Sequence, residues 1–111
     1  ALPQEDGGML VYSSTQHPDE VQHLVARATA CAAKDVVCIC RRMGGAFGGK
    51  ESQAALFACL AALGAVKTGR PCKLRMERDA DMVVTGKRHD FTIDYDVGFN
   101  HEGMIEGIDF K

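Results

Sequence analysis

The sequence has no excess of positive charge, no apolar run long enough to cross a membrane and no cysteine–histidine cluster with metal-site spacing. Its formal net charge of -2 argues against a nucleic-acid partner. Without a membrane-spanning run or a signal-peptide pattern, the chain is predicted to be cytoplasmic and to have no membrane partner. With 46% hydrophobic and 25% charged residues among 111, it has the composition of one globular domain at most.

The cysteines do not form a disulfide pattern. They are odd in number, and most of them stand among apolar residues: Cys31, Cys38, Cys40, Cys59 and Cys72. No pair has the C-x-x-C spacing of a zinc or redox site. We therefore expect all five to be reduced side chains that pack in the interior.

The order of apolar patterns predicts an α+β fold with a mixed sheet and two helices. Pro18 and the acidic residues after it are typical of a helix start, and an apolar stripe follows as far as Ala32. The second helix is predicted from Gln53 to a stop at Gly69. Because it is apolar on nearly every face, it should be buried on more sides than this short chain can cover.

Strands are predicted where β-branched or alternating apolar residues occur. They cover residues 9–14, 36–40, 72–76, 91–99 and 104–110, with a charged turn at 77–81 and a hairpin loop at 100–103. The chain opens at Ala1 without methionine and stops at Lys111 inside a strand pattern. We therefore expect residues 1–111 to be a single segment cut from a longer polypeptide.

Four glycines lie in the turn between the predicted strand 36–40 and the second helix. They are Gly44, Gly45, Gly48 and Gly49, and a purely structural turn needs fewer. Glycine lets the backbone approach a ligand, and the first turn of the helix offers unpaired N–H groups at the positive end of its dipole. The turn is therefore predicted to bind an anionic or oxo-bearing group.

A nucleotide phosphate is one alternative occupant. Residues 44–50 match the G-x-x-x-x-G-K pattern of a phosphate-binding loop. The next residue should be Ser or Thr, but it is Glu51, and two like charges ~4 Å apart repel by ~4 kcal/mol at an effective dielectric constant of about 20. A P-loop-like module is therefore the runner-up interpretation.

The run RMGGAFGGKES at residues 42–52 resembles the signature of the molybdenum hydroxylases. The resemblance is to the molybdopterin-binding domain of the aldehyde oxidase/xanthine dehydrogenase group. Within that group it is to the xanthine dehydrogenase/oxidase members. It extends over nearly the whole chain, through residues 13–16, 68–71, 78–82 and 85–89. Ala46 stands where the family usually has a third glycine, which narrows the space beside the cofactor.

The resemblance implies specific contacts. The amide of Gln16 would donate a hydrogen bond to an oxo group on molybdenum, and the backbone of Phe47 would lie beside the metal and the pterin. Both would touch the molybdenum centre without ligating it, and Gly45, Ala46 and Gly48 would complete the cofactor contact. From the residues alone, Gln16 reads more readily as a cap of the helix that begins at Pro18, and Phe47 can also fill the core.

Glu51 carries the substrate argument. In purine-oxidising relatives this position is Glu and binds the heterocycle, whereas aldehyde-oxidising relatives usually have an apolar residue there. The resemblance therefore implies a purine, with oxidation of hypoxanthine or xanthine to urate, and leaves an aldehyde oxidase-type enzyme as an alternative. Interaction of Glu51 with the helix dipole alone would contribute only ~0.3–1 kcal/mol.

For the intact protein, the resemblance implies an oxidoreductase of purine catabolism. Besides molybdenum–molybdopterin it would use [2Fe–2S] clusters and FAD on other modules or subunits, with NAD as acceptor, in an oligomer. The catalytic residues lie elsewhere in the family's chain, so this segment alone should be inactive. Arg41 and Arg42 could bind the pterin phosphate or an internal carboxylate, and Lys50 is expected on a solvated or phosphate-facing side.

Overall fold

A short three-stranded sheet forms the base of the molecule. The computed structural model describes residues 1–111, and its first sheet contains β1 (Leu2–Pro3), β2 (Met9–Tyr12) and β3 (Val36–Ile39), in that order. β1 pairs with β2 antiparallel and β2 pairs with β3 parallel. A parallel pair needs a crossover connection, which α1 (Pro18–Thr29) and the 3₁₀ helix η1 (Ala33–Asp35) supply.

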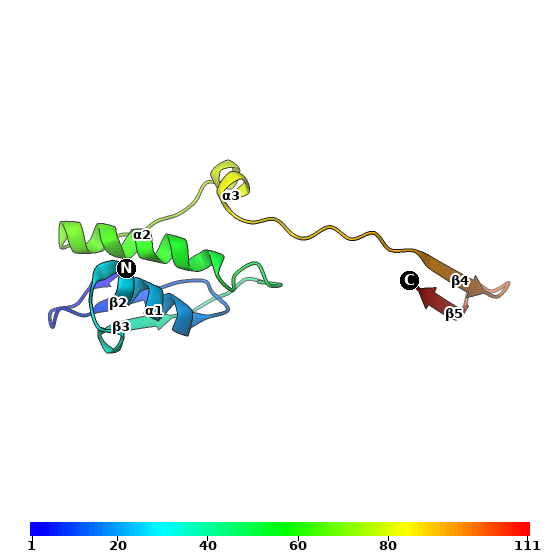
Figure 1. Cartoon of the computed structure of the whole chain (residues 1–111), viewed down its shortest axis with the longest axis horizontal. Coiled ribbons are helices and arrows are strands. Elements are labelled where there is room, and N and C mark those ends of the chain that lie inside the picture. The colour runs from blue at the N-terminus through cyan, green and yellow to red at the C-terminus, as the bar shows by residue number, and fades with distance from the viewer.

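The core lies between the sheet and two helices that pack on each other, α1 and α2 (Gln53–Thr68) (Figure 1). α1 contacts β3, and α2 contacts β1 and β2. α2 contributes only alanines to the buried cluster, and these small side chains let the helix lie close to its neighbours. The buried cluster comprises Met9, Val11, Val21, Val25, Ala26, Val36, Ala55, Ala58, Ala62 and Ala65.

Both predicted helices are present, with one boundary corrected. Pro18 stands in the first turn of α1, and α2 ends at Gly69, whose φ is 64°. The apolar stripe predicted α1 to continue to Ala32, but the helix stops at Thr29. Ala30 adopts a left-handed conformation (φ 56°), and the Cys31 N–H turns back to the Ala26 carbonyl at 3.0 Å.

Three of the predictions for the second half of the chain are wrong. Residues 72–76 form no strand, although Cys72 exchanges two backbone hydrogen bonds with Ala1, at 2.8 and 2.9 Å. The charged turn at 77–81 is instead the start of a third helix, α3 (Arg78–Val84), whose first turn holds acidic residues that suit the helix dipole. The strand predicted at 91–99 is limited to β4 (Tyr95–Phe99), because β5 (Ile105–Phe110) provides partners only for those residues.

The hairpin loop at 100–103 is confirmed. The Asn100 side-chain carbonyl accepts hydrogen bonds from the N–H groups of Glu102 and Met104, at 2.9 and 3.1 Å. The β4–β5 hairpin lies away from the body at the end of an extended arm, and the molecule measures 70 × 29 × 22 Å (Figure 1). The α+β class is therefore confirmed, with one helix more than predicted.

Two apolar surfaces remain exposed. One face of the hairpin consists of cross-strand apolar pairs that are 37–68% exposed: Tyr95–Phe110, Val97–Ile108 and Phe99–Ile105. The other face carries the Asp96–Asp109 and Gly98–Gly107 pairs. The outer side of α2 exposes Leu56, Leu60 and Val66, so the expectation that this chain cannot cover all of α2 is confirmed.

None of the helices combines the length and the hydropathy needed to cross a lipid bilayer.

Candidate functional site

The glycine loop, residues 43–49, connects β3 to α2 through left-handed backbone conformations. Gly44, Gly45 and Gly48 have φ values of 69°, 100° and 80°, and Phe47, which is not a glycine, has 51°. Three of the four loop glycines therefore adopt the positive φ that glycine allows, whereas Gly49 does not. None of the backbone N–H groups of residues 44–48 donates a hydrogen bond within the chain, and the loop's one internal bond runs from the Gly49 N–H to the Ala46 carbonyl at 2.8 Å. The loop thus offers a row of unpaired donors.

The Lys50 main chain joins this loop to the segment before α1. The Lys50 carbonyl accepts hydrogen bonds from the Gln16 N–H at 2.9 Å and from Thr15 Oγ1 at 3.1 Å. In return, the Lys50 N–H donates to Gln16 Oε1 at 3.3 Å. These bonds place Gln16 beside the glycine loop although the two are far apart in sequence.

The side chain of Gln16 does not cap α1. His17 is the N-cap residue, and no side chain makes a capping bond there. The Gln16 amide oxygen is occupied by Lys50, whereas its Nε2 group donates no hydrogen bond within the chain. The cap interpretation is therefore wrong, and Gln16 retains a neutral donor for an external group.

The Lys50 side chain is held by the protein itself. Its Nζ donates to Ser14 Oγ at 2.9 Å and to the Met43 carbonyl at 2.5 Å, and Ser14 Oγ also donates to that carbonyl at 2.9 Å. Lys50 is partly exposed and its bond to Ser14 lies at the surface, so the expectation of a solvated or phosphate-facing side stays a prediction. No local pattern links Ser14 or Met43 to Lys50, so these contacts could not be predicted from the sequence.

The two arginines before the loop differ. The Arg41 guanidinium lies over the Tyr12 ring, 4.3 Å from its centroid, and its Nη2 donates to the Tyr12 hydroxyl at 3.0 Å. Arg41 therefore binds an aromatic side chain and no carboxylate of this chain. Arg42 is exposed and makes no hydrogen bond or ion pair within the chain.

Phe47 and Glu51 extend from the loop toward solvent. Phe47 is 102% exposed, so it does not fill the core. A Cβ added to Gly45 would meet the exposed Phe47 ring only at 3.4 Å, close to ordinary contact, so this glycine is needed for its φ of 100° rather than for space. Glu51 is exposed, forms no ion pair, and directly follows the residue whose main chain is bonded to Gln16. The structure thus brings together Gln16, the glycine loop and the backbone at Glu51.

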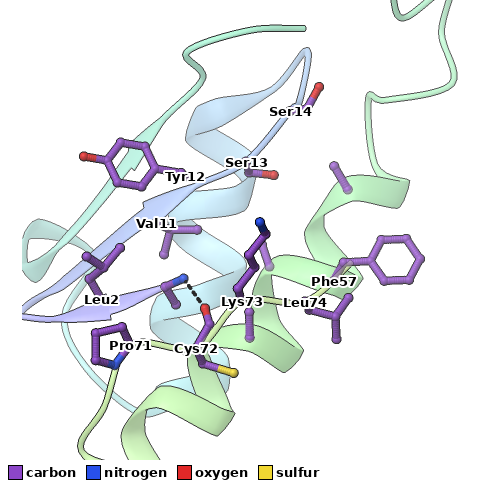
Figure 2. A pocket seen from close by; sticks show the side chains of 14 residues that line it. Leu2, Val11, Tyr12, Ser13, Ser14, Phe57, Pro71, Cys72, Lys73 and Leu74 are labelled. Atoms are coloured by element: carbon purple, nitrogen blue, oxygen red, sulfur yellow. Dashed lines mark hydrogen bonds between the residues drawn. The ribbon is translucent and has the colours of Figure 1, made fainter. Parts of the chain in front are cut away.

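The main groove of the molecule lies beside this site and does not include it. It has a volume of about 540 Å³ and runs between β2 and α2, with residues 71–74 along its side (Figure 2). Ser14 is at one end, and the lining is mostly apolar, including Val11, Phe57 and Leu74. Gln16, Phe47 and Glu51 do not line it. Its apolar lining suits side chains better than a charged cofactor, so the glycine loop remains the candidate site.

All five cysteines are free, as predicted, but they are half-buried rather than interior, and Cys40 does not pack against the buried cluster. Burial raises the pKa of the Cys38 thiol, with smaller contributions from Cys40 and Asp19, and burial alone raises the pKa of the Cys59 thiol. No three His, Cys, Asp or Glu side chains lie close enough together to bind a metal ion.

The donors at the glycine loop are backbone N–H groups and one side-chain amide. These groups suit the oxygen atoms of an anion or of an oxo group, and they add no negative charge beside it. The residues present can therefore contact an anionic or oxo-bearing group through N–H donors, without ligating a metal ion directly.

The chain is similar to known proteins of one family. The chain matches the family model described as "Molybdopterin cofactor-binding domain" over residues 1–111. It is 43% identical over 111 residues to a xanthine dehydrogenase of Drosophila subobscura, covering 100% of this chain and 8% of the relative. It is also 43% identical over 107 residues to aldehyde oxidase 2 of Rattus norvegicus, covering 96% of this chain and 8% of the relative.

A plant protein gives a similar match. The indole-3-acetaldehyde oxidase of Zea mays is 42% identical over 108 residues, which cover 97% of this chain and 8% of the relative. The chain therefore spans about a twelfth of the length of these curated relatives.

Proposed function

The chain belongs to the molybdopterin cofactor-binding domain family, and from this we propose that its glycine loop and Gln16 bind the molybdenum–molybdopterin cofactor of a xanthine dehydrogenase-like oxidoreductase. The observation that carries the proposal is the junction at Lys50. Its backbone holds Gln16 beside a loop whose N–H groups at residues 44–48 have no partner in the chain. Residues 1–111 would form one segment of that domain.

Each residue of the proposed site has a defined task. Gln16 is oriented by the bond from the Lys50 N–H to its Oε1, so its Nε2 is the group left to donate to an oxo group on molybdenum. The backbone of Gly45, Ala46, Phe47 and Gly48 would supply further donors to the cofactor. When bound, such a cofactor supplies the oxidative hydroxylation of a carbon with oxygen from water, while the protein orients and shields the reactants.

We further propose that Glu51 selects a purine. Its carboxylate is exposed and unpaired within the chain, so it can accept a hydrogen bond from a ring N–H. A site built to hydrogen-bond a substrate discriminates strongly against analogues that lack the matching group. The relatives include xanthine dehydrogenases and aldehyde oxidases at similar identity, so overall similarity does not distinguish a purine from an aldehyde substrate. The proposal that the substrate is hypoxanthine or xanthine, oxidised to urate, therefore depends on Glu51.

The remaining parts of the reaction belong to the larger protein. We propose that electrons pass to [2Fe–2S] clusters and FAD on other modules or subunits and then to NAD, in a cytoplasmic oligomer. This part rests on the family membership, because the relatives are about twelve times longer than the matched segment.

Substitution of Gln16 tests the cofactor contact. In the intact protein, Gln16→Ala should lower molybdenum content or reduce kcat by about 10²-fold, the loss typical of one preorganised donor. Metal analysis and steady-state kinetics measure both, and Gln4→Ala, at an exposed position far from the loop, is the matched control. Normal molybdenum content together with normal turnover would refute the role of Gln16.

Substitution of Glu51 tests the substrate. Glu51→Ala should lower kcat/KM for xanthine by about 10²-fold or more while changing kcat/KM for a simple aldehyde far less. Glu102→Ala, in the exposed hairpin loop, controls for loss of a surface carboxylate. Equal losses on both substrates would remove the argument for a purine and favour an aldehyde oxidase-type enzyme.

The nucleotide interpretation has lost its main support. Lys50, which would have to reach the phosphates, is bonded through Nζ to Ser14 and Met43. We expect no saturable binding when Mg-ATP is titrated onto the protein, and saturation would reopen this alternative.

A further inference from the structure

We propose that Lys50 is a positioning residue that closes the glycine loop, acting through its main chain at one end of the loop and its side chain at the other. The proposal rests on the proposed function in one respect only: the ligand that the closed loop receives is taken to be the molybdenum cofactor.

The Lys50 side chain bonds the start of the loop. Lys50 Nζ donates to the carbonyl of Met43, the residue directly before Gly44, and to Ser14 Oγ, which bonds the same carbonyl. Hydrogen bonds from an ionised donor are about twice as strong as neutral ones. The ammonium has no carboxylate partner in the chain, so its two protein contacts are both made at this corner.

The Lys50 main chain fixes the end of the loop. The Lys50 carbonyl and N–H bond the backbone and the side chain of Gln16, and Thr15 Oγ1 adds a third bond from a fully buried position. One residue therefore anchors both ends of the loop to the same neighbouring segment, residues 14–16.

The loop needs such anchors because it has little other support. Glycine gains more conformational freedom than other residues when it is released, and the left-handed conformation of Phe47 is unfavourable for a non-glycine residue. The loop's one internal backbone bond joins Gly49 to Ala46. Without the Lys50 side chain, the first half of the loop would be tied down only by the bond from Ser14 to Met43.

The experiment compares Lys50→Met and Lys50→Arg in the intact protein, with Lys67→Met at the exposed end of α2 as the matched control. Millisecond hydrogen exchange read by mass spectrometry is applied to cofactor-free protein. Molybdenum content and kcat per molybdenum are measured on the protein as isolated.

The Lys50→Met substitution should speed exchange at the hydrogen-bonded amides of Gln16, Gly49 and Lys50 by about tenfold to a hundredfold, the factor for losing one charge-assisted bond. Exchange in α1 should not change. Molybdenum content should fall with it, and Lys50→Arg, which keeps a cationic donor, should restore both. If Lys50→Met does not fold, Ser14→Ala is used instead. It removes one partner of Lys50 Nζ and should give a smaller effect of the same kind.

Exchange and molybdenum content equal to those of Lys67→Met would overturn the proposal. So would faster exchange spread evenly over α1 and α2, because that is a general loss of stability. If the unsubstituted protein carries no molybdenum, the proposed function fails, while the exchange result still decides whether Lys50 closes the loop.

Discussion

Thr15 allows the most direct energetic test of the site. It is the only buried polar residue of the chain and is 0% exposed. Its hydroxyl accepts a hydrogen bond from the His17 N–H at 3.0 Å and donates one to the Lys50 carbonyl at 3.1 Å. Thr15→Val keeps the shape of the side chain and removes both bonds.

The two lost bonds have similar costs. The Lys50 carbonyl keeps the Gln16 N–H as a donor, so that loss is about 0.5–1.5 kcal/mol. The His17 N–H loses its protein partner, but it is only part-buried and can bind water instead, so this loss is also about 0.5–1.5 kcal/mol. With a small gain from burying a methyl group, we expect Thr15→Val to lower the free energy of unfolding by about 2 kcal/mol.

Urea unfolding of the 111-residue chain, followed by circular dichroism of the helices, measures this change. At a typical urea dependence for a small protein, 2 kcal/mol lowers the midpoint by about 1–2 M. Thr68→Val, at the exposed end of α2, is the control. It removes a bond to the Gly64 carbonyl (2.8 Å) and one from the Arg70 N–H (3.3 Å), but water can replace both there, so stability should change by less than about 0.5 kcal/mol. A Thr15→Val effect no larger than that of the control would refute the view that this hydroxyl holds the junction together.

Two further outcomes are expected. Ala30→Gly should raise the unfolding free energy by about 0.5–1 kcal/mol, because Ala30 adopts a left-handed φ of 56°; an unchanged or lower urea midpoint would contradict this. The raised thiol pKa values of Cys38 and Cys59 lower their thiolate fraction, so iodoacetamide should modify them more slowly in the folded chain than in urea. The stability gained from keeping these two thiols protonated is fully present below the ordinary thiol pKa and is lost as the pH rises through the raised pKa values. A series of urea midpoints above pH 8 should therefore fall with pH, and a flat series would contradict this.

The elements that the sequence predicted well are those fixed by local pattern. Pro18 begins α1, Gly69 ends α2, and Asn100 organises the hairpin loop through bonds to residues within a few positions of it. The strand predicted at 72–76 failed because alternation specifies a face but not a partner, and only Cys72 finds one, in Ala1. Helix α3 was missed because its charged first turn has the composition of a loop.

In the candidate site, too, features set by local sequence were predicted and features that depend on distant partners were not. The four glycines predicted a turn that leads into α2, and three of them, together with Phe47, adopt positive φ there. Thr15 and Lys50 escaped prediction because their roles depend on hydrogen bonds between segments that only the folded sheet brings together. Whether Gln16, Phe47 and Glu51 touch cofactor and substrate stays a prediction for the experiments above.

The one-sided β4–β5 ribbon also has a consequence for how the protein folds. Two strands by themselves are marginally stable in water, and this pair presents its six large apolar side chains on a single side. The β4–β5 strand pairing should therefore be stable only when another surface covers that side. Folding of the hairpin and its docking are then one event. Protection of the ribbon amides would then report assembly of the surrounding protein, independently of the state of the body.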